Sequence, residues 1–181
     1  MLDAALGYLL KHGVANASLR PIASKLETSP RILMFHFKSK EGLLRDVMQE
    51  LNLRLQRSLG TLVAARHSSR TSAAPLKLFW EWAIRKENLP SLRLLYEAQI
   101  IAMQNPAQYG PYLKKASSDW HVLALQLMSA SSKKDSLATL SIAVFDGLLL
   151  ELMATGDRRR LTAALDDFIL IARHAVGRSQ A

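Results

Sequence analysis

Basic and hydroxyl-bearing residues gather between positions 18 and 40, and their side chains are the ones best suited to binding chemistry. This segment holds five basic residues against one acidic residue, Glu27, which gives a net charge of +4 over 23 residues. The five basic residues are Arg20, Lys25, Arg31, Lys38 and Lys40. Lysine and arginine bind phosphate oxygens and displace the counterions that surround a polyanion. The segment is therefore a candidate for binding the phosphates of a nucleic acid.

Other kinds of site chemistry have weak support in this sequence. The five histidines are His12, His36, His67, His121 and His174. No two of them are three or four positions apart, so no helix would present a histidine pair to a metal ion. Cysteine is absent, and no nucleophile-elbow, phosphate-loop or dinucleotide-binding pattern occurs. We therefore expect no metal, no cofactor and no enzymatic activity.

Two short helices with a tight turn between them are predicted to carry the basic segment. Ser18 is a candidate N-cap for the first helix, and Pro21 fits its first turn, where a missing N–H is tolerated. One face of this helix is apolar, with Leu19, Ile22, Ala23 and Leu26 at the i, i+3, i+4 and i+7 positions. Glu27 and Thr28 interrupt that face, so the turn is expected there.

The second helix is predicted to begin after Ser29, an N-cap candidate, with Pro30 in its first turn. Its apolar residues are expected to anchor it on the first helix: Ile32, Leu33, Phe35 and Phe37. Arg31, Met34 and His36 are then expected to point away. Two helices joined in this way, with a basic exposed side, form the layout of a helix-turn-helix DNA-binding unit.

Residues 2–47 resemble the DNA-binding domain of the TetR family of bacterial transcriptional repressors. The matching features are an amphipathic first helix that ends at Gly13, the groups Ser18-Leu19-Arg20 and Ile22-Ala23, Ser29, Leu33, the aromatic cluster Phe35-His36-Phe37, and Lys38-Ser39-Lys40-Glu41, which opens the next helix. Beyond residue 47 the chain is similar to the family in its helical plan and in the segment from Asp146-Gly147-Leu148 to Thr155-Gly156-Asp157.

The resemblance implies a fold, a domain division and a function. The fold is all-α, with a three-helix helix-turn-helix DNA-binding domain over residues 1–45 and a helical effector-binding and dimerisation domain over residues 46–181. The function is that of a transcriptional repressor that binds a palindromic operator as a homodimer and is released by a small-molecule effector. The alternative is a helical small-molecule binding protein whose DNA binding has weakened or been lost.

Three departures from the family pattern motivate that alternative. Glu27 stands where the family usually has glycine at the turn, and a positive φ there would cost a glutamate roughly 1 kcal/mol. Met34 replaces the usual tyrosine, which removes a common phosphate or thymine contact. The numbering also begins almost at the first helix, without the basic arm that many relatives carry before it.

The residues expected to meet double-stranded DNA lie in and around the two short helices. They are Ser18, Arg20, Thr28, Ser29, Pro30, Arg31, Ile32, Met34, His36, Lys38 and Lys40. Arg31 is expected to read a guanine edge, and Ile32 and Met34 to reach thymine methyl groups. Two hydroxyls, those of Ser18 and Ser29, are expected to fix the protein on phosphates, as are His36 and Lys40.

Hydrophobic periodicity and chain breaks predict nine helices and no strand. The predicted ranges are 2–12, 19–26, 30–36, 40–66, 73–87, 89–104, 107–130, 134–154 and 158–176. Gly13 ends the first helix, and Thr155-Gly156-Asp157 forms a tight turn between the last two, with glycine at a helix C-terminus and aspartate at an N-cap.

The last two predicted helices carry apolar stripes, and Gly147 would permit close approach of another helix. Two antiparallel helices can pair with a two-fold copy to form a four-helix interface. The stripes can equally pack onto the chain's own core, and the resemblance favours the dimer. The expected interface residues are Leu140, Val144, Gly147, Leu148, Leu161, Leu165, Phe168, Ile169, Ala172 and Val176.

Aromatic residues concentrate between positions 79 and 120, in the region that encloses an effector pocket in the resembling family. The expected pocket residues are Phe79, Trp82, Tyr96, Gln99, Ile100, Met103, Trp120, Leu123, Leu127 and Phe145. Such pockets are mostly apolar with a few polar groups, which Gln99 or His121 would supply. Residue by residue, an aromatic at helical spacing is more often part of the core. The sequence does not identify the effector.

Composition sets the outer bounds. The net charge of +9 and the pI of about 10.1 favour a polyanionic partner, although basic residues are spread over the whole chain. The most apolar segment, residues 142–153, contains Asp146 and Glu151 and is too short to span a bilayer. With no secretory signal visible and no cysteine, we expect a cytoplasmic protein without a membrane partner.

Overall fold

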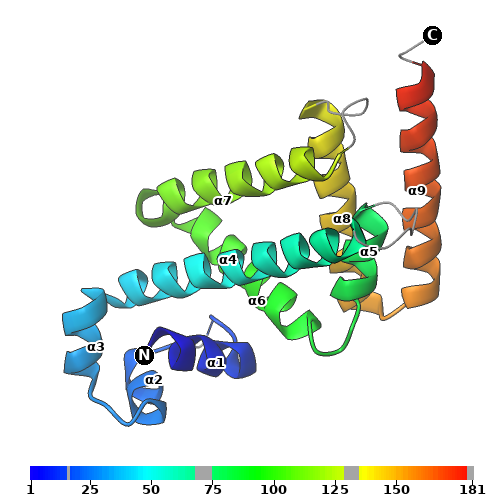
Figure 1. Ribbon diagram of the computed structural model, residues 1–181. Coiled ribbons are helices and arrows are strands. Elements are labelled where there is room, and N and C mark those ends of the chain that lie inside the picture. Colours follow the sequence, from blue (N-terminus) through cyan, green and yellow to red (C-terminus); the bar gives the residue numbers. More distant parts are fainter. Residues whose placement is uncertain (16, 68–74, 129–134, 179–181) are drawn as a thin grey trace. The chain divides into compact units, whose positions relative to one another are not determined.

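The computed structural model describes residues 1–15, 17–67, 75–128 and 135–178; the side chains of 63, 65–67 and 175–178 lie outside the description. Within these ranges the chain forms nine α-helices and no strand, which confirms the predicted all-α fold (Figure 1). The helices are α1 (Leu2–His12), α2 (Leu19–Lys25), α3 (Pro30–Phe37), α4 (Lys40–His67), α5 (Pro75–Ala83), α6 (Leu89–Gln104), α7 (Pro106–Leu127), α8 (Asp135–Thr155) and α9 (Arg158–Arg178).

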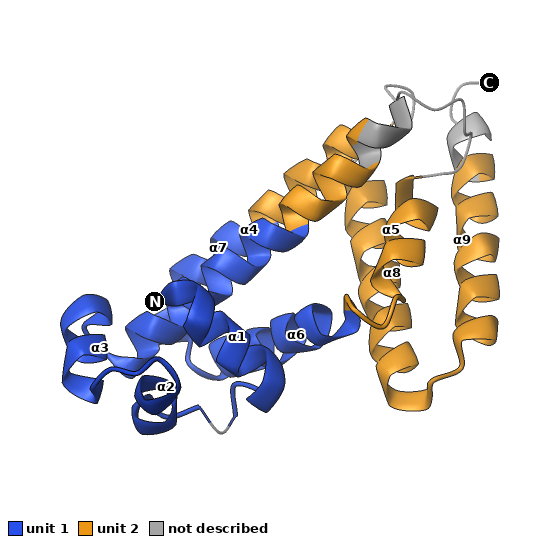
Figure 2. Ribbon diagram, turned by 60° about the horizontal axis from the view of Figure 1, so that its bottom comes forward, with its two compact units in different colours: residues 1–55, 89–117 blue, residues 56–88, 118–181 orange. Residues whose placement is uncertain are grey.

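The helices pack as two compact units, which Figure 2 colours separately. Unit 1 comprises residues Met1–Leu55 and Leu89–Ser117, and unit 2 comprises Gln56–Asn88 and Ser118–Ala181. Helices α4 and α7 each contribute to both units. This division reflects packing, whereas the predicted boundary between residues 45 and 46 is a functional one, and it stays a prediction.

The core of unit 1 joins the three N-terminal helices to α6 and to the first parts of α4 and α7. Helix α1 buries one face, and α2 and α3 bury the residues that face each other across the turn. The buried residues of α1 to α3 are Ala5, Leu6, Leu9, Ile22, Ala23 and Leu33. Helix α1 ends at Gly13, whose φ of 74° suits a residue without a β-carbon.

Serine side chains set the starts of α3 and α4. Ser29 Oγ accepts a hydrogen bond from the Ile32 backbone N–H at 3.3 Å, and Pro30 follows as the first helical residue. Ser39 Oγ accepts from the Gly42 N–H at 2.8 Å, which caps α4. Ser18 has the extended backbone of an N-cap, but its side chain makes no capping hydrogen bond to α2.

Helix α5 is shorter than predicted at its C-terminal end. The sequence pattern predicted a helix over 73–87, whereas the helix ends at Ala83. The Asn88 side-chain amide donates to the Trp82 carbonyl oxygen at 2.8 Å, and the Asn88 N–H donates to the Arg85 carbonyl oxygen at 3.0 Å. These bonds close turns before α6 begins. The predicted ends at 73, 129–130 and 134 lie outside the described residues.

Unit 2 is built on α5, α8 and α9. Trp80 is completely buried, and its indole N–H donates to Thr162 Oγ1 at 2.9 Å, which fixes α5 on α9. The α8–α9 turn places Asp157 as the N-cap of α9, with Oδ1 accepting from the Arg160 N–H at 3.1 Å. The Arg160 guanidinium also pairs with Glu151 at 2.8 Å. This arginine therefore ties the start of α9 to the end of α8.

Helix α8 is long and apolar enough to cross a membrane by length and composition alone, with a mean hydropathy of 1.8 in its most apolar stretch. It extends beyond the segment 142–153 considered from the sequence. The buried cores of soluble proteins contain helices of the same kind, and α8 packs on α5 and α9 through Phe145, Leu149 and Leu152. Helix α8 thus packs one side into the core of unit 2, and only 22% of its most apolar stretch is buried, so its other side is open.

Candidate functional site

The outer side of α3 carries the side chains that were expected to read base edges. Arg31 is exposed, and Ile32 and Met34 are 44% and 42% exposed. An arginine is suited to a guanine edge and apolar groups to thymine methyls. One short helix thus presents an arginine and two apolar side chains to an approaching partner.

The packing of α3 relies on fewer residues than predicted. Leu33 is completely buried and Phe37 is half-buried, and these two residues lie four positions apart on one helical face. The prediction that Ile32 and Phe35 also anchor the helix is wrong. Ile32 and Phe35 lie three positions apart along a different face of the helix. A two-turn helix presents only one narrow stripe to its neighbour, so this second face stays exposed.

Phe35 is the residue of this surface that sequence reasoning missed. Its side chain is 73% exposed, the highest value among the large apolar residues described. The sequence did contain a signal for this exposure, because Phe35 is three positions after Ile32 and does not share the helical face of the buried Leu33. A ring this open on a basic surface is available to a binding partner.

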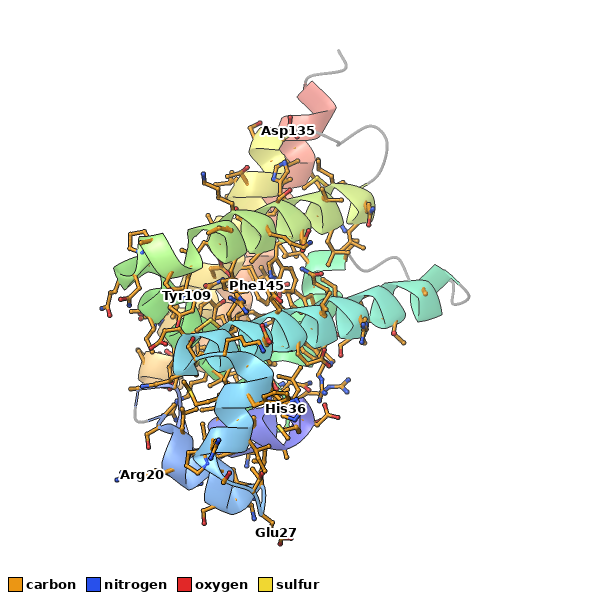
Figure 3. All side chains as sticks on the ribbon, turned by 90° about the vertical axis from the view of Figure 1, so that its left-hand side faces the viewer. Arg20, Glu27, His36, Tyr109, Asp135 and Phe145 are labelled. Atoms are coloured by element: carbon orange, nitrogen blue, oxygen red, sulfur yellow. The ribbon has the colours of Figure 1, made fainter. Side chains whose placement is uncertain are left out.

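The turn between α2 and α3 has a left-handed backbone at Glu27, where φ is 51°. The Glu27 N–H donates to the Ser24 carbonyl oxygen at 3.2 Å, and the Thr28 N–H donates to the Ala23 carbonyl oxygen at 3.0 Å. The positive φ explains why glycine suits this position. Glu27 itself is exposed, and Figure 3 shows its side chain at the outer edge of the turn.

A second left-handed residue, Lys38 with a φ of 67°, ends α3. Its backbone N–H donates to the Met34 carbonyl oxygen at 2.9 Å, which closes the last turn of the helix. After Ser39, Lys40 is the first residue of α4. Two lysines therefore flank the N-terminus of a helix, where free N–H groups and the helix dipole attract phosphate.

The other residues assigned to DNA contact lie on the same helix-turn-helix. Ser18 and Arg20 are exposed at the start of α2, and Figure 3 shows Arg20 extending away from the ribbon. Thr28 is half-buried in the turn, whereas Pro30 and His36 are exposed on α3. The structure thus brings these side chains onto one unit. Their contact with DNA stays a prediction.

Four aromatic residues of the predicted effector pocket lie together in unit 2. The Phe79 ring stacks on Phe145, with centroids 4.5 Å apart and an interplanar angle of 11°. Trp82 and Trp120 also stack on Phe79, with centroid distances of 5.5 and 6.0 Å. Phe79 and Phe145 are buried, whereas the two tryptophans are half-buried. The cluster therefore offers partly open rings to which a flat ligand could stack.

The remaining predicted pocket residues lie on α7 and α6. Leu123 and Leu127 are half-buried on the part of α7 that belongs to unit 2. On α6 of unit 1, Tyr96 is buried and Gln99 is half-buried. Ile100 and Met103, also on α6, are 50% and 59% exposed, so neither lines an enclosed pocket of unit 1.

Two buried tyrosines of α7 were not among the predicted site residues. Tyr112 is 4% exposed, and its hydroxyl has no hydrogen-bond partner among the described residues. Burial raises the pKa of Tyr112 to about 12. Burial also raises the pKa of Tyr109, helped by the nearby Glu41 and opposed by Arg45. Tyr112 is thus a buried polar group in need of a hydrogen-bond partner.

The predicted dimer-interface residues divide into open and buried groups. Leu140 and Gly147 are exposed, and five others are half-buried: Val144, Leu148, Phe168, Ile169 and Ala172. Leu161 and Leu165 are 2% and 0% exposed in the core of unit 2, so placing them at an interface was wrong. A side chain inside its own core has no surface left for a second copy. The side chain of Val176 lies outside the described residues.

Metal-ligand clusters are absent from the part of the chain that the structure describes. His121 Nε2 lies 3.1 Å from Asp135 Oδ1, which links α7 to α8, but this pair alone does not make a metal site. Among the described residues, the candidate surfaces for function are the exposed side of α3, the aromatic cluster of unit 2 and the exposed apolar side chains of α8 and α9, such as Leu140 and Ile171.

Comparison with known sequences agrees with the helix-turn-helix geometry. Residues 1–47 match the family described as bacterial regulatory proteins, tetR family. The chain is also 29% identical over 164 residues to the HTH-type nicotine-responsive transcriptional repressor HdnoR of Paenarthrobacter nicotinovorans. That alignment covers 85% of this chain and 82% of the relative.

Comparison with solved structures shows the same fold over nearly the whole chain. A transcriptional regulator from Rhodococcus sp. Rha1 has a TM-score of 0.77 at 16% identity, covering 96% of this chain and 94% of that chain. The multidrug binding protein EbrR, complexed with imidazole, has a TM-score of 0.70 at 20% identity, covering 98% and 90%. Its complex with ethidium has a TM-score of 0.69 at 20% identity, covering 92% and 94%.

Proposed function

We propose that this chain, which belongs to the TetR family of bacterial transcriptional regulators, is a repressor that binds a palindromic operator as a homodimer and is released by a small-molecule effector. The observation that carries the proposal is the exposed side of the eight-residue helix α3. Arg31, Ile32 and Met34 are open there, directly after a tight turn and within a basic segment. That is the arrangement with which a recognition helix reads a major groove.

In the proposed complex α3 enters the major groove of the operator. Arg31 reads a guanine, and the apolar side chains of Ile32 and Met34 contact thymine methyls. Lys40 and the N-terminus of α4 bind backbone phosphates, which positions the helix without adding sequence preference. Two copies would read half-sites roughly 34–36 Å apart, or a multiple of that distance.

The open side of α8 and α9 supports the proposed homodimer. Four large apolar side chains are 46–66% exposed on these two helices: Leu140, Leu150, Leu170 and Ile171. Leu161 and Leu165 are buried inside unit 2 and leave the opposite side of α9 open. A two-fold copy would cover the exposed side chains with the same surface, as in most symmetric dimers.

The aromatic cluster of unit 2 supports a flat, aromatic, nitrogen-containing effector. Phe79 and Phe145 form its buried base, and the rings of Trp82 and Trp120 are partly open. The relative HdnoR is named for its response to nicotine, and EbrR was solved with imidazole and with ethidium. An effector that favours one arrangement of the DNA-binding units by 1–3 kcal/mol, a typical coupling energy, would release the operator. We place this regulator in the cytoplasm.

Selection of bound DNA from a random duplex pool, at two salt concentrations, tests the proposal. The purified protein should enrich a palindrome. Arg31→Ala should weaken binding to that palindrome by about 1–3 kcal/mol and relax the preference at one base position. Lys40→Ala should weaken binding to all DNA alike and flatten the salt dependence.

An unchanged base preference in Arg31→Ala would remove Arg31 from the readout. If the wild-type protein enriches no sequence, the DNA-binding proposal fails. Glu27 and Met34 favour the alternative function in that case, a small-molecule binding protein. Quenching of tryptophan fluorescence by nicotine or ethidium, without selective DNA binding, would then support that alternative.

A further inference from the structure

Helix α1 is held at both of its ends by carboxylate groups within unit 1. At its N-terminal end Asp3 pairs with Arg54 of α4, which also pairs with Glu50 at 2.7 Å. Just beyond its C-terminal end, the Val14 backbone N–H donates to Glu97 Oε2 of α6 at 3.0 Å. Asp3 and Arg54 are 80% and 44% exposed, and such surface pairs contribute little stability. The Glu97 contact is the more sheltered of the two, because the Glu97 side chain is 29% exposed.

The Glu97 carboxylate fits closely against the turn that follows α1. A β-carbon added at Gly13 would lie 2.8 Å from Glu97 Oε2, which shows how closely the carboxylate approaches the turn, and the φ of 74° at this position favours glycine. The other carboxylate oxygen, Oε1, accepts a hydrogen bond from Arg93 Nε at 3.2 Å. Glu97 therefore uses one oxygen to bind the turn and the other to keep its own orientation on α6.

The turn that Glu97 holds is connected to the DNA-reading helix by packing. Helix α6 packs on α1, α1 packs on α2, and α2 packs on α3. Leu9 near the end of α1 and Ile22 of α2 are completely buried among these packed helices. Fixing the end of α1 on α6 therefore restricts the orientation of α3 with respect to α6.

We infer that Glu97 is a positioning residue for DNA binding, which fixes the orientation of the helix-turn-helix by holding the Val14 N–H on α6. The inference rests on the proposed function and adds a residue outside the DNA-contacting surface. A hydrogen bond to an ionised carboxylate is about twice as strong as one between neutral groups, which suits a contact that sets an orientation. Without it the helix-turn-helix samples more orientations, and apparent affinity falls with the fraction that is competent to bind.

The test uses the full-length protein, the operator that it selects, and two altered operators whose spacer is one base pair longer or shorter. Glu97→Ala should weaken binding to the native spacing by about tenfold, which corresponds to roughly 1.4 kcal/mol. It should also reduce the preference for the native spacing over the altered ones. Glu97→Gln should retain most of the preference, because an amide oxygen still accepts from the Val14 N–H. Glu87→Ala is the control, because Glu87 is exposed and its replacement by alanine changes the net charge by the same amount.

Hydrogen exchange of the Val14 amide supplies a readout that needs no DNA. Exchange should be faster in Glu97→Ala than in wild type and unchanged in Glu87→Ala. Unchanged Val14 exchange in Glu97→Ala would overturn the inference at its first step. Equal loss of affinity for all three spacings, together with a lower melting temperature, would make Glu97 merely structural and would also overturn it. If wild type enriches no operator while Val14 exchange responds as expected, the proposed function is what has failed, and the positioning role fails with it.

Discussion

The Lys38 ammonium lies 5.3 Å from the centroid of the Phe35 ring and donates to the Phe35 carbonyl oxygen at 3.1 Å. Both residues are exposed, so this cation–π pair forms on the outside of α3. It places an aromatic ring beside a cation on the surface that we propose enters the major groove. The pair is thus suited to contact both an apolar base edge and a phosphate.

Replacing Phe35 by alanine should weaken operator binding while leaving the fold intact. Loss of the ring's apolar contact should reduce the binding free energy by about 1–2 kcal/mol, and an exposed substitution should change the free energy of unfolding by no more than about 0.5 kcal/mol. Operator titration and urea unfolding measure the two quantities. Leu33→Ala is the contrast, because Leu33 is completely buried two positions away and its loss should destabilise the fold by about 2–5 kcal/mol. An unchanged operator affinity in Phe35→Ala would remove the ring from the interface.

Replacing Glu27 by glycine should raise both stability and DNA affinity. The φ of 51° is strained for glutamate and free for glycine, so the free energy of unfolding should rise by about 0.5–1 kcal/mol. Removing a carboxylate from a phosphate-facing surface should also tighten DNA binding, more so at low salt. Glu27→Gln separates the two effects, because it removes the charge and keeps the side chain. Equal unfolding free energies for the Gly and Gln variants would show that backbone strain is not the cause.

Two glycines of α4 should respond to alanine with opposite signs. A β-carbon at Gly42 would lie 2.0 Å from the Phe37 carbonyl oxygen, a backbone atom that cannot move aside without disturbing the end of α3. Gly42→Ala should therefore destabilise the protein by about 1–3 kcal/mol. A β-carbon at Gly60 would meet nothing within 4 Å, and Gly60→Ala should stabilise the helix by about 0.5–1 kcal/mol. Thermal unfolding of the two variants would contradict this account if both changed stability in the same direction.

Replacing Tyr112 by phenylalanine should remove one component of alkaline unfolding. The folded chain holds the Tyr112 proton up to a pKa of about 12, whereas the unfolded chain releases it near the ordinary value of 10.0. The unfolded state therefore binds fewer protons between these values. The contribution of Tyr112 to the free energy of unfolding is fully present below pH 10 and is lost as the pH rises toward 12. The loss attributable to this group is about 2–3 kcal/mol. Wild-type and Tyr112→Phe unfolding curves should separate over this pH range, and parallel curves would contradict the assignment.

Near neutral pH the same substitution tests the hydroxyl itself. A buried hydroxyl without a partner costs roughly 1–3 kcal/mol, so Tyr112→Phe should be neutral or stabilising at pH 7. A clear loss of stability there would mean that the hydroxyl has a hydrogen-bond partner in solution.

Local features of the chain were readable from the sequence. Ser29 followed by Pro30 marked the start of α3, Gly13 marked the end of α1, and Thr155-Gly156-Asp157 marked the turn between α8 and α9. These signals depend on backbone groups and side chains within a few residues of one another, so no distant contact was needed to interpret them. For the same reason the sequence located the turn at Glu27. It did not determine whether φ is positive at this residue, and the structure shows that it is.

The burial of particular side chains was decided by the packed helices. Apolar periodicity identified the stripes of α3 and α9, yet Phe35 is open and Leu161 is buried. A stripe in the sequence shows which residues share a face, whereas the neighbouring helix determines how much of that face is covered. The contact between Val14 and Glu97 joins residues 83 positions apart, and no local pattern predicts such a pair. Helix starts, turns and the basic segment thus followed from short-range chemistry. The exposure of the Phe35 ring, the burial of the α9 core residues and the contact of the Glu97 carboxylate with the turn after α1 depend instead on the packing of helices that are distant in sequence.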